Sequence, residues 1–386
     1  MTTLRELHEK SNVTMGVYNG RLVPASYNTP EVEYKAVREN ALMVDYSHMA
    51  IISVMGDDAW SLVNYFASAD ISTIRDEQAI YSLVLNEDGS IAGDMYVLCT
   101  DEGYYLISEN LTTDSITDRL ISILDNSDNL DVDENPVITA KDVQDWGVIL
   151  VEGPYAWEVL SEIYGFDIVG LPYHEYMNTD DGLMALRCGK HGEFAYMLIG
   201  EQATLFNVWT RLLESGQKFC IKTGGLDYQN TVRIENPYWM PSPHSGHCYN
   251  PVEIQMQWAI QYDKENFIGK AAAERLSNAG ATRKMIGILP LGPCEDIAID
   301  NKVKAEGQDV GFIVKSVYSP ACQSFIALAL IDSHYAYSDI EGFEIATKSG
   351  AVAAKSHNVP FFYNFSMLVN PTEHSYIDVT KAKSAL

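Results

Sequence analysis

The chain has 386 residues, of which 47% are hydrophobic, so it can bury a substantial core, and this length is typical of two or three domains. Asp and Glu total 53 against 26 Lys and Arg, and the formal net charge of -27 disfavours nucleic acid and anionic membrane surfaces as partners. The first 13 residues are charged, which disfavours a signal peptide, and no apolar run of about 18 residues is present to span a membrane. The six cysteines include no C-x-x-C pair, which disfavours a zinc ribbon and a disulfide scaffold. We therefore expect a cytoplasmic protein with reduced thiols.

Strands and helices alternate irregularly from residue 51 onward. A strand over 51–54 is followed by a helix that Asp57 or Asp58 can cap, and further strand-like runs cover 79–85, 95–99, 104–107 and 148–151. Two more helices are predicted, one after Thr113 and one over 202–215 with Gly216 as its stop. The apolar stripes of these three helices, which we interpret as core, are Trp60, Val63 and Phe66; Ile116, Leu120, Ile123 and Leu124; and Leu205, Val208, Trp209 and Leu212.

From about Arg283 the chain changes character. It consists of short strand-like runs divided by Gly, Pro, Asp and Ser, which favours a separate C-terminal β-barrel or sandwich that begins near residue 275. No internal repeat of fixed period is present, which disfavours solenoids and propellers. The fold class expected from these patterns is α+β with antiparallel sheets.

Several short motifs occur in a fixed order between residues 34 and 361. They are Val37-Arg38, Asp45-Tyr46-Ser47-His48-Met49, the segment 81–94 (YSLVLNEDGSIAGD), Val151-Glu152-Gly153-Pro154, the segment 187–193 (RCGKHGE), Val232-Arg233-Ile234-Glu235, Asn250-Pro251-Val252-Glu253 with Trp258 and Phe267-Ile268-Gly269-Lys270, and Gly311 to Ser316 with Ser319-Pro320 and Pro360-Phe361. None is specific alone, but their order and spacing make chance similarity improbable.

In these motifs the chain resembles the glycine-cleavage T-protein (aminomethyltransferase) family. The resemblance implies an α+β fold of three domains in a cloverleaf around a central folate channel, with tetrahydrofolate as the cofactor. The implied domains are a discontinuous folate-binding domain 1 over 1–48 and about 143–262, an α+β domain 2 over 49–142, and a C-terminal β-barrel domain 3 over 275–386.

The resemblance implies a catalytic role for Asp94, and the chemistry of the transfer leads us to assign a second one to His48. Transfer of a one-carbon unit to tetrahydrofolate requires an acid or base near the reacting nitrogen, and Asp94 matches the family's catalytic aspartate. An ordinary turn aspartate is the alternative. His48, Tyr18 or His191 can supply the proton that leaves with the donor, and Tyr18 and His191 are also assigned to the substrate site.

Five positions are assigned to the folate site. Glu193 offers a carboxylate to the two adjacent N–H donors of a pterin ring, unless it is an ordinary turn residue. Met49, Tyr81 and Trp258 match channel walls in the family, where aromatic faces suit a flat ring. Arg233 pairs either with the glutamate tail of folate or with Glu235 inside the protein.

The proline-rich segment 237–251 is interpreted as a stiff loop near the substrate mouth, with Trp239 as a substrate contact. His244, His247 and Cys248 also permit a metal interpretation, which we disfavour because no helix aligns the histidines and no second ligand cluster follows. No metal is therefore assigned.

Several positions depart from the T-protein pattern around the presumed channel. They are Glu109, Lys190, His191, Phe194-Ala195 and Gln229, where the family has asparagine, tyrosine, threonine, Asp-Gly and arginine. Together with Gly93-Asp94 and Pro241-Ser242-Pro243, they favour the folate-dependent O-demethylase branch. The predicted function is therefore transfer of a methyl group from a small O-, S- or N-methylated molecule to tetrahydrofolate.

Three alternatives stay open. The first is a glycine-cleavage aminomethyltransferase. Its lipoyl carrier protein is usually acidic and would be repelled by this acidic chain. The negative charge can also reflect a halophilic or marine habitat and have no functional meaning. The second is a folate-binding accessory protein of iron–sulfur assembly, for which Cys188 would be the reactive thiol. The third is a module left by a flavin enzyme that has lost its oxidase half.

Overall fold

The computed structural model describes residues 3–11, 13–126, 130, 132–244, 247–294 and 296–383 and divides into two compact units. Unit 1 contains the chain up to Leu83, Asp94–Tyr228 and the chain from Asn364 on, and unit 2 contains Val84–Gly93 and Gln229–Tyr363. The three-domain division expected from the family resemblance stays a prediction.

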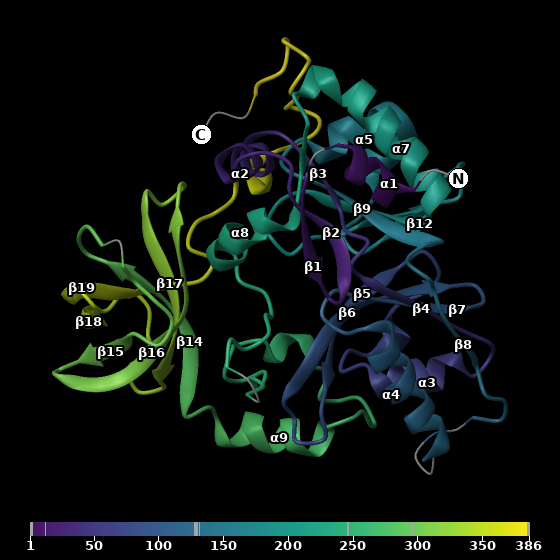
Figure 1. Cartoon of the computed structure of the whole chain (residues 1–386). Coiled ribbons are helices and arrows are strands. Elements are labelled where there is room, and N and C mark those ends of the chain that lie inside the picture. The colour runs from purple at the N-terminus through teal and green to yellow at the C-terminus, as the bar shows by residue number, and fades with distance from the viewer. Residues whose placement is uncertain are drawn as a thin grey trace. The chain divides into compact units, whose positions relative to one another are not determined.

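The first sheet of unit 1 has six strands in the order β10-β11-β12-β9-β3-β13, with helices packed against it. In Figure 1, helices α5 and α7 lie beside strands β9 and β12. Trp209, Leu205 and Leu212 of α7 are fully buried in the core between helix and sheet, as their helical spacing predicts. The strands are β3 Leu42–Asp45, β9 Trp146–Glu152, β10 Tyr176–Asn178, β11 Met184–Arg187, β12 Ala195–Glu201 and β13 Lys222–Gly224; the helices are α1 Leu4–Lys10, α2 Pro30–Glu39, α5 Ala156–Tyr164, α6 Asp167–Gly170 and α7 Gln202–Ser215.

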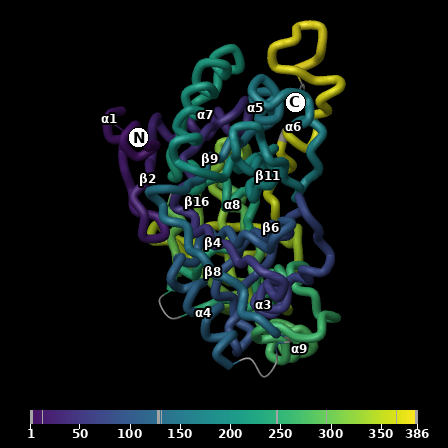
Figure 2. Tube along the Cα trace, turned by 90° about the vertical axis from the view of Figure 1, so that its right-hand side faces the viewer, coloured from purple at the N-terminus to yellow at the C-terminus, as the bar shows by residue number. Residues whose placement is uncertain are grey.

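The second sheet has five strands in the order β5-β6-β7-β4-β8, and its β4, β7 and β8 pair antiparallel. Helix α3 packs against β4 and β7, and helix α4 packs against β4 and β8 (Figure 2). Helix α4 buries Ile116, Leu120 and Ile123 of the predicted stripe. The strands are β4 Ala50–Met55, β5 Ala79–Leu85, β6 Ile91–Thr100, β7 Gly103–Ser108 and β8 Val137–Ala140; the helices are α3 Ala59–Phe66, η1 Ile71–Thr73 and α4 Thr113–Asp125.

Unit 1 also contains a two-stranded hairpin, β1 Thr14–Tyr18 and β2 Arg21–Ser26. Asn19 and Gly20 join the strands with φ of 48° and 74°, which is the backbone of a tight primed turn that asparagine and glycine favour. The hairpin therefore holds Tyr18 at a fixed strand end. Short 3-10 turns elsewhere in the unit are η2 Gly216–Phe219, η3 Leu226–Tyr228 and η5 Phe365–Leu368.

Unit 2 contains a closed barrel in the order β14-β17-β16-β15-β18-β19, which confirms the predicted C-terminal β-barrel and the α+β class. The barrel begins at Arg283, where the sequence pattern changes. Its strands are β14 Arg283–Pro290, β15 Lys302–Ala305, β16 Gln308–Ser319, β17 Ser324–Asp332, β18 Glu341–Thr347 and β19 Gly350–His357, and the helices of the unit are α8 Gln229–Glu235, η4 Gln257–Ala259 and α9 Lys270–Ala279.

Two predicted helix boundaries differ in detail. Asp58 stands at the N-cap of α3 but makes no capping hydrogen bond, because its Oδ2 accepts from the backbone N–H groups of Asp133 and Glu134, both at 2.8 Å. Helix α7 ends at Ser215 as predicted, but Gly216 keeps a helical φ of -74° and the left-handed residue is Cys220, with φ of 55°. No helix among the described residues is long and apolar enough to span a membrane.

Candidate active site

Asp94 is the fourth residue of β6, inside the strand rather than before it, and its side chain is 0% exposed. The Tyr81 hydroxyl on neighbouring β5 donates to Oδ2 at 2.8 Å, and the Asn110 amide donates to Oδ1 at 3.0 Å. The Ser108 hydroxyl donates to the backbone carbonyl of Asp94 at 2.7 Å. A buried carboxylate that accepts from two side chains, on a backbone held by a third, is fixed in orientation, which excludes the ordinary surface turn.

A lysine completes the environment of Asp94. The Lys190 ammonium lies 2.5 Å from Asp94 Oδ2 and 3.4 Å from Glu109 Oε2, and its side chain is also buried. The ammonium also lies 5.6 Å from the ring centroid of Tyr81. One buried cation therefore joins two buried carboxylates, Asp94 in β6 and Glu109, which directly follows β7.

His48 joins the same cluster through Glu109. Its Nε2 lies 3.4 Å from Glu109 Oε1, and its ring packs edge-on against Tyr46 and Tyr18, with centroids 4.8 Å and 6.2 Å away. The buried Nδ1 of His48 has no hydrogen-bond partner among the described residues. Because a buried ring nitrogen without a partner is costly, this atom is suited to exchange a proton with a bound molecule.

Tyr18, predicted at the substrate site, donates to Asp227 Oδ1 at 2.7 Å. Burial, the hydrogen bond to Asp227 and the Asp227 charge all raise the pKa of Tyr18 far above its usual value. Its hydroxyl is therefore a poor acid in this state. Met49 is buried, and its carbonyl accepts from the Arg21 guanidinium at 2.7 Å, which ties β4 to the hairpin.

Glu193 lies in a second buried cluster. Its Oε1 accepts from Arg38 at 2.7 Å and from the Asn364 amide at 3.1 Å, and its Oε2 accepts from the Ser366 hydroxyl. Burial raises the pKa of Glu193 to about 7, although the Arg38 charge and these hydrogen bonds oppose the rise. Since a carboxylate has about four acceptor positions, one remains on Oε2 for an external donor.

His191, three residues after Cys188, pairs with a different carboxylate. Its Nδ1 lies 2.9 Å from both oxygens of Glu152, which also accepts from the Tyr228 hydroxyl at 2.7 Å. Burial alone would raise the pKa of Glu152, but the His191 charge, the two hydrogen bonds and the Arg38 charge hold it below its usual value. This carboxylate is therefore ionised and fixes the imidazole of His191.

The remaining predicted site residues belong to unit 2. Trp258 is 60% exposed with its ring 6.0 Å from that of Tyr238, whereas Trp239 is buried. The Glu235 carboxylate accepts from the Ser319 hydroxyl at 2.6 Å, and burial, together with the charge of Arg233 in α8, lowers the pKa of Lys315. The folate role of Arg233 stays a prediction.

The structure thus brings Asp94, Tyr81 and His48 together. Arg38 and Asn364 each donate both to the backbone carbonyl of His191 and to Glu193 Oε1, and so link these two predicted residues. The contacts that connect the first cluster, Glu109 and Lys190, appear in the sequence only as departures from the family pattern. The sequence signal that could have predicted their contact is their opposite charge. Glu109 replaces an asparagine and Lys190 replaces a tyrosine, and an acid and a base introduced at one site neutralise each other.

Cys188 is fully buried, and burial raises the pKa of its thiol far above the usual value. A thiol of this kind is unreactive, because the thiolate is the nucleophile. The metal interpretation of His244, His247 and Cys248 finds no support among the described residues. His244 pairs with Asp300 at 2.7 Å, and no group of three or more His, Cys, Asp or Glu in this part of the chain could hold a metal ion.

Comparison with known proteins agrees with this fold. The family model described as the GCVT N-terminal domain matches residues 4–264, and that of the glycine cleavage T-protein C-terminal barrel domain matches residues 283–362. An aminomethyltransferase of Alkaliphilus metalliredigens is 30% identical over 87% of this chain and 90% of its own length, and one of Desulfitobacterium hafniense is 26% identical over 92% and 95%.

A solved structure has the same fold. The glycine cleavage system aminomethyltransferase T from Bartonella henselae matches with a TM-score of 0.80 and 20% identity, over 94% of this chain and 97% of that one. The fold and the family inferred from the motifs are both confirmed. The chain belongs to the glycine cleavage T-protein family, whose members use tetrahydrofolate to carry one-carbon units.

Proposed function

We propose that this chain is a tetrahydrofolate-dependent one-carbon transferase working at Asp94, and that its reaction is the aminomethyl transfer for which its relatives are named. The observation that carries the proposal is the buried Asp94 carboxylate, held by Tyr81, Asn110 and Lys190. Relatives named aminomethyltransferase align over 87% of the chain or more, which supports the choice of reaction.

The residues present suit tetrahydrofolate. The partnerless Nδ1 of His48 and the remaining acceptor position of Glu193 are buried polar groups that a pterin with adjacent N–H donors can satisfy. Glu193 would hold the ring edge, and Asp94 and Tyr81 would face the reactive nitrogen. When bound, tetrahydrofolate supplies the nucleophilic nitrogen that accepts the one-carbon unit.

The protein side of the reaction is positioning and proton control. Asp94 is buried and accepts from three donors, so it presents one carboxylate orientation, which lowers the entropic cost of the transfer. His48, Glu109 and Lys190 form a line of contacts of 3.4, 3.4 and 2.5 Å that ends on Asp94. A proton held at His48 Nδ1 can therefore be delivered to a leaving group while Glu109 fixes the opposite ring nitrogen.

A second candidate is methyl transfer from a small O-, S- or N-methylated donor. The observation that favours it is the contact between Lys190 and Asp94, because this ammonium neutralises the carboxylate that would otherwise attract the amine of an aminomethyl donor. The net charge of -27 also disfavours docking of an acidic lipoyl carrier protein. Aminomethyl transfer requires that carrier, whereas methyl transfer does not.

The donor is tested by product analysis. Purified protein is mixed with tetrahydrofolate and either an aminomethylated lipoyl carrier or a panel of methoxyaromatic and methylsulfonium compounds, and the folate products are identified by mass spectrometry. The aminomethyl reaction gives 5,10-methylenetetrahydrofolate and ammonia, and the methyl reaction gives 5-methyltetrahydrofolate. No folate product with either donor class would contradict both candidates.

The variant Lys190→Tyr/Glu109→Asn, which restores the family residues at both positions, distinguishes the candidates further. If the native reaction is methyl transfer, the double variant should lose it and gain activity toward the carrier. If the native reaction is aminomethyl transfer, the variant should keep the same donor.

A further inference from the structure

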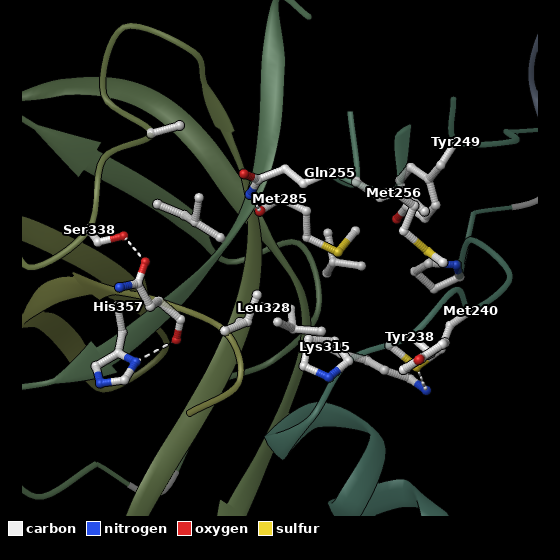
Figure 3. A pocket seen from close by; sticks show the side chains of 18 of the residues that line it. Tyr238, Met240, Tyr249, Gln255, Met256, Met285, Lys315, Leu328, Ser338 and His357 are labelled. Carbon is white, nitrogen blue, oxygen red and sulfur yellow. Dashed lines mark hydrogen bonds between the residues drawn. The ribbon is translucent and has the colours of Figure 1, made fainter. Parts of the chain in front are cut away.

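The pocket within unit 2 shares a residue with the predicted folate site. It has a volume of about 370 Å³ and lies between the loop over 237–258 and the barrel, where Tyr238, Met240 and Lys315 line it (Figure 3). Trp258, which the family resemblance assigns to the folate site, lines the same pocket. The pocket is therefore a predicted part of that site, and the residues that we add to the site lie in unit 1.

The C-terminal segment over 364–383 packs within unit 1, although it follows the barrel of unit 2 in the sequence. Val369 is buried in the core between the first sheet and its helices, and Tyr376 packs against the same core. Glu158 of α5 anchors the segment, because its Oε2 accepts from the backbone N–H of Tyr376 at 2.7 Å and its Oε1 accepts from the Ser375 hydroxyl. These contacts come from a part of the chain that lies outside the ranges matched by the two family models.

Two buried side chains at the start of this segment contact Glu193. The Asn364 amide donates to Glu193 Oε1 at 3.1 Å and to the backbone carbonyl of His191 at 2.6 Å. The Ser366 hydroxyl donates to Glu193 Oε2 and accepts from the backbone N–H of Phe194 at 3.1 Å. Because a backbone N–H can only donate, the proton of the Ser366 hydroxyl points to the carboxylate.

The donors around Glu193 determine which of its oxygen atoms can meet a ligand. Oε1 accepts from Arg38 and from Asn364, which fills its two acceptor positions, whereas Oε2 accepts from Ser366 and keeps one. Building on the function proposed above, in which Glu193 holds the ring edge, we infer that Asn364 and Ser366 are positioning residues of the folate site. They hold the Glu193 carboxylate in one orientation, with the remaining position of Oε2 open to an N–H donor of the pterin.

The charges around Glu193 make its proton affinity sensitive to these donors. Burial and the Glu152 charge raise the pKa of Glu193, whereas the Arg38 charge and the hydrogen bonds from Ser366 and Arg38 lower it. His191, which pairs with Glu152, is the other titratable side chain of this cluster. A hydrogen bond to an ionised carboxylate favours the ionised form, so loss of the Ser366 hydroxyl raises the pKa of Glu193.

The titration of Glu193 tests the role of Ser366 without any ligand. The full chain is labelled with glutamate carrying carbon-13 at the side-chain carboxyl, and the resonance that is lost in Glu193→Gln is followed by NMR across neutral pH. Ser366→Ala should raise the pKa of Glu193, with a decrease in its acid dissociation constant on the order of tenfold. Ser366→Thr keeps the hydroxyl and should titrate close to the parent. A purely structural role would lower thermal stability without moving this titration, and an unchanged titration in Ser366→Ala would overturn the assignment.

Calorimetric titration with tetrahydrofolate measures the effect on the site. Ser366→Ala should bind on the order of tenfold more weakly than the parent below neutral pH, and the difference should narrow at alkaline pH, where Glu193 is ionised in both. Asn364→Leu, which keeps the volume but loses the amide, should also weaken binding. The control is Thr372→Ala, which removes an exposed hydroxyl of the same segment and should bind as the parent does.

The pattern across the variants separates the role of the segment from the proposed function. If Glu193→Gln loses affinity for tetrahydrofolate but Ser366→Ala and Asn364→Leu bind as the parent does, the proposed function stands and the two residues do not position Glu193. Tighter binding by Ser366→Ala would show that the hydroxyl competes with the pterin for Oε2, and would also overturn the assignment. Absence of binding by the parent would contradict the proposed function, and the Glu193 titration would then decide alone whether Ser366 acts on this carboxylate.

Discussion

The Lys190 ammonium lies 2.5 Å from Asp94 Oδ2, and the two residues are separated by 96 positions in the sequence. The same ammonium reaches Glu109, so one cation holds two buried carboxylates together. A buried pair of this kind contributes little net stability, because desolvation of the charges offsets their attraction, but loss of one partner is costly. Lys190 therefore matters both for the fold around Asp94 and for the charge that a donor meets there.

Lys190→Met should destabilise the protein by about 3 to 5 kcal/mol, because Asp94 and Glu109 would remain buried without their cation. Urea unfolding at pH 7.5 measures this loss. The matched variant is Lys190→Met/Glu109→Gln, which removes one carboxylate charge as well and should recover part of the loss. Additive effects of the two substitutions would contradict the shared ion pair, since contacting residues are expected to couple.

Asp94→Asn should lower the rate of one-carbon transfer by about 10² to 10⁴-fold, which is the usual contribution of a positioned acid or base. Single-turnover assays with the donor found active measure this rate, and circular dichroism checks the fold. Asp101→Asn, an exposed turn aspartate of the same sheet, is the control and should leave the rate unchanged. Equal rates in Asp94→Asn and the parent would remove Asp94 from the reaction.

Glu193 should make stability depend on pH. Burial raises its pKa to about 7 from the usual 4.5, so the folded state binds this proton more tightly than the unfolded chain. The free energy of unfolding should then decrease as the pH rises from about 4.5 to about 7, by up to about 3 kcal/mol. The difference in unfolding free energy between the parent and Glu193→Gln, measured across this range, isolates the effect from other carboxylates.

The same titration should affect folate binding, because ionisation of Glu193 strengthens the remaining acceptor position on Oε2, which would accept from an N–H donor of the pterin. Arg38, Ser366, Asn364 and Glu152 surround or influence the group, and the Arg38 charge favours ionisation. Tetrahydrofolate affinity of the parent should therefore increase between pH 6 and pH 8. A flat pH profile in the parent, equal to that of Glu193→Gln, would show that Glu193 does not meet the ring.

Cys188→Ala should leave one-carbon transfer within a factor of about two, because the buried thiol is held protonated and takes no part in the reaction. The loss of the sulfur should cost roughly 1 kcal/mol of stability. An accessory protein of iron–sulfur assembly that relied on this thiol would instead fail in a cluster-assembly assay with the same variant. Loss of cluster assembly in Cys188→Ala, with the fold intact, would favour that alternative.

Local patterns predicted much of the fold. The apolar spacing of Leu205, Val208, Trp209 and Leu212 predicted α7 with both of its ends, because an amphipathic stripe is a property of consecutive residues. Asp58, one of the two aspartates considered as the cap, does stand at the N-cap of α3, but it makes no capping hydrogen bond. Its carboxylate bonds to backbone groups 75 and 76 residues away, and no local signal reports such a partner.

The candidate site was predicted in part. Asp94, Tyr81 and His48 were identified from motifs, and the structure brings them together through Glu109 and Lys190. The roles of Glu109 and Lys190 could not be derived singly, because a contact across 81 residues depends on the packed sheet. The one sequence signal for this contact was that Glu109 and Lys190, both departures from the family pattern, carry opposite charges.

The most direct test of the central claim is calorimetric titration of tetrahydrofolate into the parent chain and into Asp94→Asn and Glu193→Gln. If Asp94 faces the reacting nitrogen and Glu193 holds the ring edge, the parent and Asp94→Asn should bind one equivalent with similar affinity, and Glu193→Gln should bind on the order of tenfold more weakly. The absence of saturable binding to the parent would contradict the proposed function.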